Sequence, residues 1–99
     1  MGVKQVEYHQ GAIADVKNAV TWYQKRSPKA ALDFIGELNR AANAIREAPE
    51  CWPKGKNDTR RFLLWRFPFT MIYSEQDSVI TIWAVAHGSR RPEYWVHRL

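Results

Sequence analysis

Hydrophobic and polar residues alternate along this chain with two different periods, and the changes of period mark its elements. Residues 3–8 are rich in β-branched and aromatic side chains, which is typical of a strand. From Gly11 on, hydrophobic positions recur every three or four residues, and this spacing predicts an amphipathic helix over residues 12–25. Its expected hydrophobic face consists of Ile13, Val16, Val20 and Tyr23, with polar residues such as Asp15 between them. Trp22 and Tyr23 are expected to be core anchors of this helix.

A second helix is predicted directly after the first. Ser27 can accept a hydrogen bond from a free amide at the helix start, and Pro28 suits the first helical position because an N–H there would have no partner. Pro49 ends the helix after Ala48. Its hydrophobic stripe is Ala31, Phe34, Ile35, Leu38, Ala41, Ala42 and Ile45. The short connection predicts that the two helices form an antiparallel hairpin.

Residues 50–59 read as a polar loop, and the rest of the fold has the period of strands. Strands are predicted at about residues 60–66, 69–75 and 79–87. The last of these is apolar on both alternating faces, which favours a central position in the sheet. The order βααβββ predicts one α+β domain over residues 1–99, with the helical hairpin packed on one face of a mostly antiparallel sheet.

The chain is basic, and its positive charge is unevenly distributed. The formal net charge is +5, and residues 54–99 hold eight Lys or Arg against four Asp or Glu. This asymmetry suggests a basic face that attracts either a nucleic acid or an acidic protein. Cys51 is the single cysteine, so no intramolecular disulfide is possible. No run approaches the roughly 18 apolar residues that cross a bilayer, and we expect a cytoplasmic protein without membrane association.

The sequence gives little support for metal or cofactor chemistry. His9, His87 and His97 are scattered, and no helix carries two ligand residues at metal-binding spacing. Glycine-rich phosphate loops, nucleophile elbows and dinucleotide fingerprints are absent from the sequence. We therefore expect neither a metal ion nor a cofactor.

Arginines lie on the first predicted strand after the loop. Side chains of a strand alternate between faces, so Arg60 and Arg66 are expected on one face and Arg61 on the other. One of these sets should face away from the helices. Arginines on an open sheet face can hold a phosphodiester backbone.

A second basic and aromatic group follows the last predicted strand. It consists of His87, Arg90, Arg91, Tyr94 and Trp95. Guanidinium groups match phosphate oxygens, imidazole titrates near neutrality, and aromatic rings stack on unpaired bases. His87 is a candidate general acid or base, or it simply ends the strand before Gly88. Without a metal, cleavage of a phosphodiester would use the adjacent ribose 2′-OH, and the substrate would be RNA. The same residues equally suit a solvated segment that docks on a protein.

Motifs along the whole chain resemble the RelE/ParE superfamily of bacterial toxins. The matching segments are Ala14-Asp15-Val16, Trp22-Tyr23, Arg60-Arg61-Phe62, Arg66-Phe67-Pro68-Phe69, Ile72-Tyr73 and His87-Gly88-Ser89-Arg90-Arg91-Pro92. The resemblance implies a type II toxin that is encoded beside a small antitoxin, which wraps and neutralises it. RelE-like members cut mRNA in the ribosomal A site without a metal, whereas ParE-like members inhibit DNA gyrase.

The resemblance also implies roles for individual residues. In the nuclease branch, Arg66 would stabilise the phosphate, and His87, Arg90 and Tyr94 would supply acid, base and stacking groups. In a binding toxin, Arg60, Arg61, Arg91 and Trp95 would contact the partner, and the C-terminal segment would be the docking element. The overall pattern is closer to ParE-like chains, which favours a gyrase inhibitor over an mRNA endonuclease. A third interpretation is an inactive binding module of the same fold.

The expected antitoxin gives the basic residues a further role. An amphipathic antitoxin segment would lie against the basic sheet side or the helical hairpin. There its carboxylates could pair with Arg60, Arg61 or Arg66.

Overall fold

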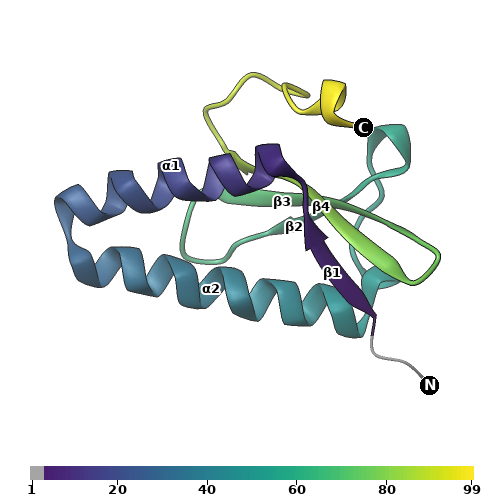
Figure 1. Ribbon diagram of the computed structural model, residues 1–99, viewed down its shortest axis with the longest axis horizontal. Helices are drawn as coiled ribbons and strands as arrows, with labels where there is room; N and C mark the ends of the chain where they lie inside the picture. Colours follow the sequence, from purple (N-terminus) through teal and green to yellow (C-terminus); the bar gives the residue numbers. More distant parts are fainter. Residues whose placement is uncertain (1–3) are drawn as a thin grey trace.

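The computed structural model describes residues 4–99, in which two helices cover one face of a four-stranded sheet (Figure 1). The elements are β1 (Gln5–Tyr8), α1 (Gln10–Arg26), α2 (Pro28–Glu47), β2 (Arg60–Leu63), β3 (Phe69–Gln76) and β4 (Val79–His87). Short 3-10 turns lie at Pro49–Cys51, Lys56–Asp58 and Val96–Arg98. The predicted order βααβββ and the α+β class are confirmed. Val3, which the pattern places in the first strand, lies outside the described residues.

Local side-chain contacts explain where the helices begin. The Nδ1 atom of His9 accepts a hydrogen bond from the Gly11 N–H at 2.9 Å at the start of α1. The Ser27 hydroxyl accepts from the Ala30 N–H at 3.2 Å, and Pro28 is the first residue of α2, as predicted. Only Ser27 separates the two helices, which run antiparallel side by side (Figure 1).

The strand order in the sheet is β1-β4-β3-β2, so β4 has a neighbour on each side. The β1–β4 pair is parallel, and the other two pairs are antiparallel. On the helix side, Ile80 and Ile82 of β4 belong to the main core with Phe34 and Ile45 of α2. The opposite side of β4 is covered as well, because residues 94–96 pack there. This explains why β4 is apolar on both faces, and its predicted central position is confirmed.

A bulge in β4 changes which side chains face α1. Ile72 pairs with Ala84 and Tyr73 with Ile82, so Trp83 is an extra residue on β4. The alternation of side chains shifts by one at this point. Val85 therefore joins Ile82 on the helix side of the sheet, whereas Ala84 packs on the far side.

Two residues of the predicted hydrophobic faces of the helices are exposed. Ile13 and Ile35 were expected in the core, but their exposed fractions are 43% and 38%. The buried stripe of α1 is instead Ala12, Asp15 and Ala19. Alanine side chains allow α1 to approach the sheet closely, and the larger Ile13 lies beside this contact.

Asp15, which the pattern places between the expected hydrophobic positions of α1, is a buried hydrogen-bonding centre. Its Oδ2 atom accepts from the Val85 N–H at 3.1 Å, from the Tyr94 hydroxyl at 2.9 Å and from Arg98 Nη1 at 2.9 Å. Its Oδ1 atom accepts from Arg98 Nη2 at 3.3 Å. Arg98 Nη1 also donates to the Trp83 carbonyl at 3.0 Å. One carboxylate thus joins α1, β4 and the C-terminal segment.

The position of this centre follows from the end of β1. The last β1 pair is Tyr8 with Ile82, so the next residues of β4 have no strand beside them on that edge. Asp15 and Arg98 provide the acceptor and the donor that a longer strand would have provided there. Gly11 is required beside them, because a Cβ atom at this position would overlap the Arg98 guanidinium. The buried ion pair of Asp15 and Arg98 therefore also provides hydrogen-bond partners for the backbone groups at this edge of β4.

Replacement of Asp15 by Asn should destabilise the fold strongly. Arg98 would lose its counter-charge in a site where the side chains are 10% and 6% exposed, and breaking such a pair costs about 3–5 kcal/mol. The matched control is Asp33→Asn, which removes more exposed contacts to Lys29 and Arg66 and should destabilise the fold much less. Urea unfolding followed by circular dichroism measures both. Equal losses in the two variants would contradict the assigned role of Asp15.

Candidate functional site

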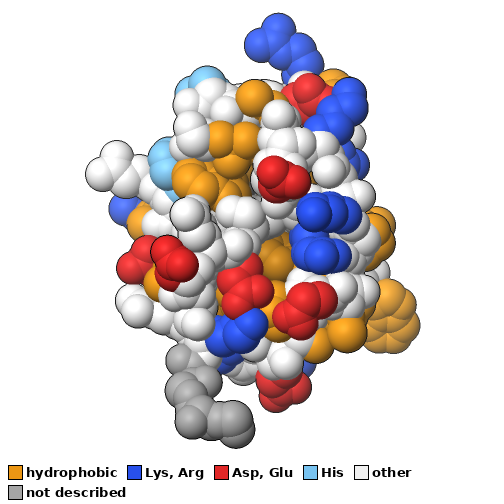
Figure 2. All heavy atoms as spheres, turned by 90° about the vertical axis from the view of Figure 1, so that its right-hand side faces the viewer, with side chains coloured by type: hydrophobic (Ala, Val, Ile, Leu, Met, Phe, Trp, Pro, Cys, Tyr) orange, Lys and Arg blue, Asp and Glu red, His pale blue; other side chains and the backbone are white. Residues whose placement is uncertain are grey.

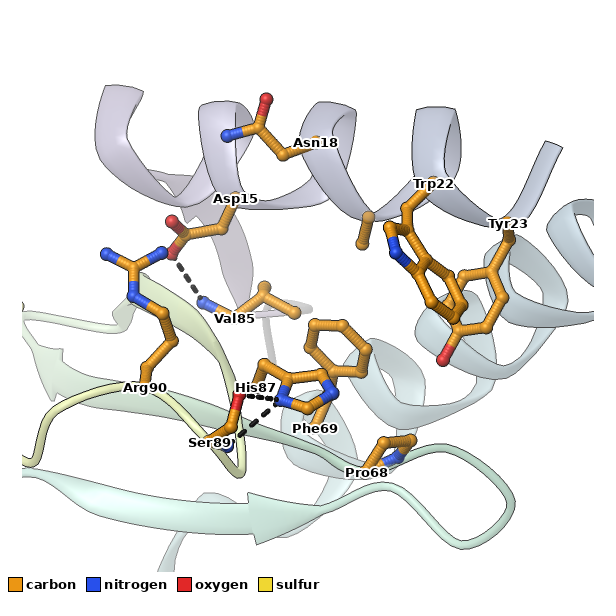
Figure 3. A pocket seen from close by; sticks show the side chains of 11 residues that line it. Asp15, Asn18, Trp22, Tyr23, Pro68, Phe69, Val85, His87, Ser89 and Arg90 are labelled. Carbon is orange, nitrogen blue, oxygen red and sulfur yellow. Dashed lines mark hydrogen bonds between the residues drawn. The ribbon is translucent and has the colours of Figure 1, made fainter. Parts of the chain in front are cut away.

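A cavity of about 530 Å³ lies between α1 and the end of β4 (Figure 3). Its volume is within the range of sites that bind small molecules or single side chains of a partner. It is lined by Asp15, Asn18, Ala19, Trp22, Tyr23, Pro68, Phe69, Val85, His87, Ser89 and Arg90. The lining thus comes from one face of α1, the start of β3, and the segment that leaves β4.

Aromatic rings form the apolar part of the cavity. Tyr23 and Phe69 belong to the core or pack against it, so this wall is held in place. Trp22 is 51% exposed and lies edge-on to Tyr23, with ring centroids 5.0 Å apart. The Arg26 guanidinium lies over the Trp22 ring, with its Cζ atom 3.6 Å from the ring centroid. The prediction that Trp22 is a core anchor is therefore wrong, because the ring forms the outer wall of the cavity instead.

His87 is the last residue of β4 and lines the cavity (Figure 3). Its Nδ1 atom accepts a hydrogen bond from the Ser89 N–H at 2.9 Å and lies 2.8 Å from the Ser89 hydroxyl. A backbone N–H can only donate, so the neutral imidazole carries its proton on Nε2. The imidazole ring is also perpendicular to the Phe69 ring, with the two ring centroids 5.0 Å apart. In this tautomer the Nε2 atom of His87 is a hydrogen-bond donor.

Arg90 and Tyr94 continue from His87 into the C-terminal segment. The Arg90 guanidinium lies 3.9 Å from the centre of the Tyr94 ring and also lines the cavity. The Tyr94 hydroxyl donates to Asp15. Burial and this hydrogen bond raise the pKa of Tyr94 to about 12. Tyr94 is therefore a protonated phenol at neutral pH, and its hydroxyl is engaged inside the fold.

Arg66 was predicted on a strand and beside the same face as Arg60. That prediction is wrong, because β2 ends at Leu63 and residues 64–68 form a turn before β3. The turn is fixed by Glu37, whose carboxylate accepts from the Arg66 N–H at 2.9 Å. The Arg66 guanidinium lies 3.6 Å from Asp33 of α2 and does not line the cavity of His87.

The other predicted binding residues have different surroundings. Arg60 donates to the carbonyls of Glu50 and Trp52, at 3.2 and 2.8 Å, and so holds the loop before β2. Trp95 is only 3% exposed and packs against Ile72 and Ala84 on the far side of the sheet. The expected free C-terminal docking segment is thus largely part of the fold.

Arg61 and Arg91 are exposed, as predicted for residues that contact a partner. Of the eight candidate site residues, His87 and Arg90 line the cavity. Asp15 and Trp22 also line the cavity, and the sequence pattern did not predict a site role for either residue. The one available signal for Asp15 was its position between Ala12 and Ala19, in register with a helical stripe of small residues.

The expected basic face is not uniform. On the side of the molecule that carries the β3–β4 turn, acidic and basic side chains are interspersed (Figure 2). Some basic side chains form ion pairs in the fold, among them Lys56 with Glu93 at 2.9 Å and Lys4 with Glu75.

Searches of residues 4–99 give three negative findings. No group of three His, Cys, Asp or Glu side chains is placed to hold a metal ion in this part of the chain. Cys51 is exposed and unpaired there. None of the helices described has the length and apolarity that crossing a membrane requires.

Comparison with known proteins gives a family for this arrangement. The sequence model described as "ParE toxin of type II toxin-antitoxin system, parDE" matches residues 6–92. The chain belongs to this ParE toxin family. The match runs from β1 to the turn after β4, and the resemblance to RelE/ParE toxins is confirmed.

A solved structure shares the fold of this ParE-family chain. It is a chain of the "Chromosomal ParDE TA system from P. aeruginosa", with a TM-score of 0.75 and 17% sequence identity. The similarity covers 86% of this chain and 96% of that chain. At this identity the comparison establishes a common fold. The search of curated proteins finds no match.

The Tyr94 phenol should make stability sensitive to alkaline pH. Its pKa is raised in the fold to about 12 from 10.0, so its contribution is complete below about pH 10 and is lost as pH rises through 12. Tyr94→Phe should therefore lose less unfolding free energy between pH 10 and 12 than the original chain. Urea unfolding across this range, with phenolate absorbance measured in parallel, provides the test. Identical pH profiles for the two proteins would contradict the assignment.

Proposed function

We propose that this ParE-family toxin inhibits bacterial growth by binding DNA gyrase in the cytoplasm. Its activity would be controlled by a cognate antitoxin that covers part of its surface. The toxin would act as a binding protein, without a metal ion or a cofactor. The family match and the fold support the toxin assignment, and the arrangement of the candidate residues supports binding over catalysis.

The observation that carries this proposal is the separation of the four nuclease candidates. His87 and Arg90 line one cavity, whereas Arg66 pairs with Asp33 outside it. The Tyr94 hydroxyl donates a hydrogen bond to the Asp15 carboxylate. A metal-free nuclease needs a base, an acid and a phosphate-binding cation around one phosphorus atom. Arg66 and Tyr94 would have to change partners or positions to meet that requirement.

The surface around the cavity has the composition of a protein-binding site. Trp22 and Arg90 line the cavity and are exposed, and Arg91, the residue after Arg90, is exposed as well. Tryptophan and arginine are enriched among the residues that dominate binding energy at protein interfaces. The cavity between them can accept an apolar side chain of gyrase. We therefore assign gyrase contact to the cavity side of the molecule.

The cleanest test combines a purified gyrase supercoiling assay with charge reversal of exposed residues. Arg90→Glu with Arg91→Glu should weaken inhibition by at least about tenfold, because Arg90 at the cavity and its exposed neighbour Arg91 are replaced by anions. His87→Ala should have a small effect. Lys17→Glu, on an exposed part of α1, is the matched control and should inhibit like the original toxin. Deletion of Arg90 to Leu99 is unsuitable, because it also removes Arg98 and Trp95 from the fold.

Expression without an antitoxin separates the competing functions. Filamentation with gyrase-linked DNA breaks is the expected result. Transcript cutting at ribosome-bound codons, abolished in Arg66→Ala or His87→Ala, would contradict the proposal and favour an mRNA endonuclease. Normal growth with soluble, folded protein would favour an inactive binding module.

A further inference from the structure

The cavity of His87 combines a fixed aromatic wall with a small number of polar groups. Tyr23 and Phe69 form part of this wall, and both rings pack on Phe34 in the core, with centroids 5.3 and 5.0 Å from its ring. Trp22 adds a third ring on the outer side. Cavities of this composition are typical of sites for small organic molecules. The apolar end therefore suits a flat ring, which can lie against these side chains.

The imidazole of His87 supplies a hydrogen-bond donor inside the cavity. Its Nδ1 atom accepts from the Ser89 N–H, which leaves the proton of the neutral ring on Nε2. Figure 3 shows the Nε2 edge of the ring turned away from Ser89, to the side where Trp22 and Tyr23 lie. A ligand group beside this edge should therefore be an acceptor, such as a carbonyl oxygen.

Arg90 supplies the cation of the cavity. Its guanidinium lies 3.9 Å from the centre of the Tyr94 ring, and the Tyr94 hydroxyl is held by Asp15. Among residues 4–99, no acidic side chain forms an ion pair with Arg90. A guanidinium that stacks on a ring through its face keeps its edge N–H groups for a carboxylate. The position of Arg90 through Tyr94 lowers the entropy that binding would cost.

The charges of the lining favour a carboxylate over a phosphate. Asp15 contributes a negative charge to the lining, but this charge is paired with Arg98. Within the described part of the chain, Arg90 is the one Lys or Arg residue that lines the cavity. One guanidinium matches the single charge of a carboxylate, whereas a phosphate monoester carries about 1.5 to 2 negative charges at neutral pH.

The two ends of the cavity set the length of a ligand. Asp15 and Trp22 lie about two helical turns, or roughly 10 Å, apart along α1. Arg90 lies at the Asp15 end, and the rings of Trp22 and Tyr23 lie at the other end (Figure 3). A ligand that reaches both ends carries its ring and its negative charge at opposite ends of a short chain.

We propose that this cavity binds a small aromatic carboxylate as a free ligand. Its ring would lie between Trp22 and Phe69, and its carboxylate would pair with Arg90. A carbonyl group between the ring and the carboxylate would accept from the His87 Nε2–H. That such a ligand competes with gyrase rests on the proposed function, whereas binding of the ligand itself does not.

Hippurate is a suitable probe, because it has a phenyl ring, a carbonyl group and a carboxylate in this order. The experiment titrates the isotope-labelled toxin with hippurate and records amide and indole spectra. Signals of the Trp22 indole, His87 and Arg90 should shift, with a Kd of about 1 mM or below, as expected of a ligand of this size. Hippuramide, which lacks the charge, should bind at least about threefold more weakly. N-acetylglycine, which lacks the ring, should bind at least about tenfold more weakly.

Substitutions of the toxin assign each part of the ligand to one side chain. Arg90→Gln should reduce hippurate binding to that of hippuramide, and Trp22→Ala should weaken binding of both. His87→Phe should abolish the preference for hippurate over 4-phenylbutyrate, which has the same length and no carbonyl group in its chain. Lys17→Gln is the matched control, because Lys17 is an exposed cation of α1 outside the lining, and it should bind hippurate like the original chain. Amide spectra of each variant check its fold.

Several outcomes would overturn the proposal. They are equal affinities for hippurate and hippuramide, unchanged hippurate binding in Arg90→Gln, shifts centred away from the cavity, and no binding at about 10 mM. Tighter binding of adenosine 5′-monophosphate than of hippurate would also overturn it, in favour of a nucleotide site.

The gyrase supercoiling assay separates this proposal from the proposed function. Hippurate should relieve inhibition by the toxin at concentrations that fill the cavity. Binding without relief would keep the ligand site and contradict gyrase contact at the cavity. A toxin that inhibits gyrase but does not bind hippurate would overturn the ligand site alone.

Discussion

The fold depends on one buried carboxylate, that of Asp15. It accepts a hydrogen bond from the Val85 N–H, in a part of β4 that lies beyond the end of β1. The same carboxylate also binds Tyr94 and Arg98 of the C-terminal segment. Burial of a charge is unfavourable unless its hydrogen bonds are satisfied, and here both oxygens accept donors. The contact therefore requires the helix, the strand and the C-terminal segment to be in place together.

This requirement also determines which residues remain available for function. Tyr94 and Trp95 are engaged in holding the C-terminal segment, and Arg60 is engaged in holding the loop before β2. The cavity of His87 is lined by α1, whereas a second groove, beside Trp65, is lined by α2, and no residue lines both.

The periods of the sequence were sufficient to predict the order of elements, because the helical and strand patterns are long and uninterrupted. The prediction failed where contacts distant in sequence decide the outcome. Two stripes on α1 fit the helical period, and hydrophobicity favoured Ile13, yet the smaller Ala12 stripe packs because Asp15 must reach β4. Likewise, Arg66 lies in a turn and not in the predicted strand, because its backbone N–H donates to the carboxylate of Glu37 on α2. No local pattern reports such partners, so site residues were harder to predict than elements.

A double-mutant cycle on Asp15 and Arg98 tests the central role of this contact most directly. The unfolding free energies of Asp15→Asn, Arg98→Gln and the double variant are compared with that of the original chain. Because the two side chains are buried against each other, the coupling energy should be about 2 kcal/mol or more. A coupling energy within about 0.5 kcal/mol of zero would mean that the two residues stabilise the fold independently, and it would contradict the account given for Asp15.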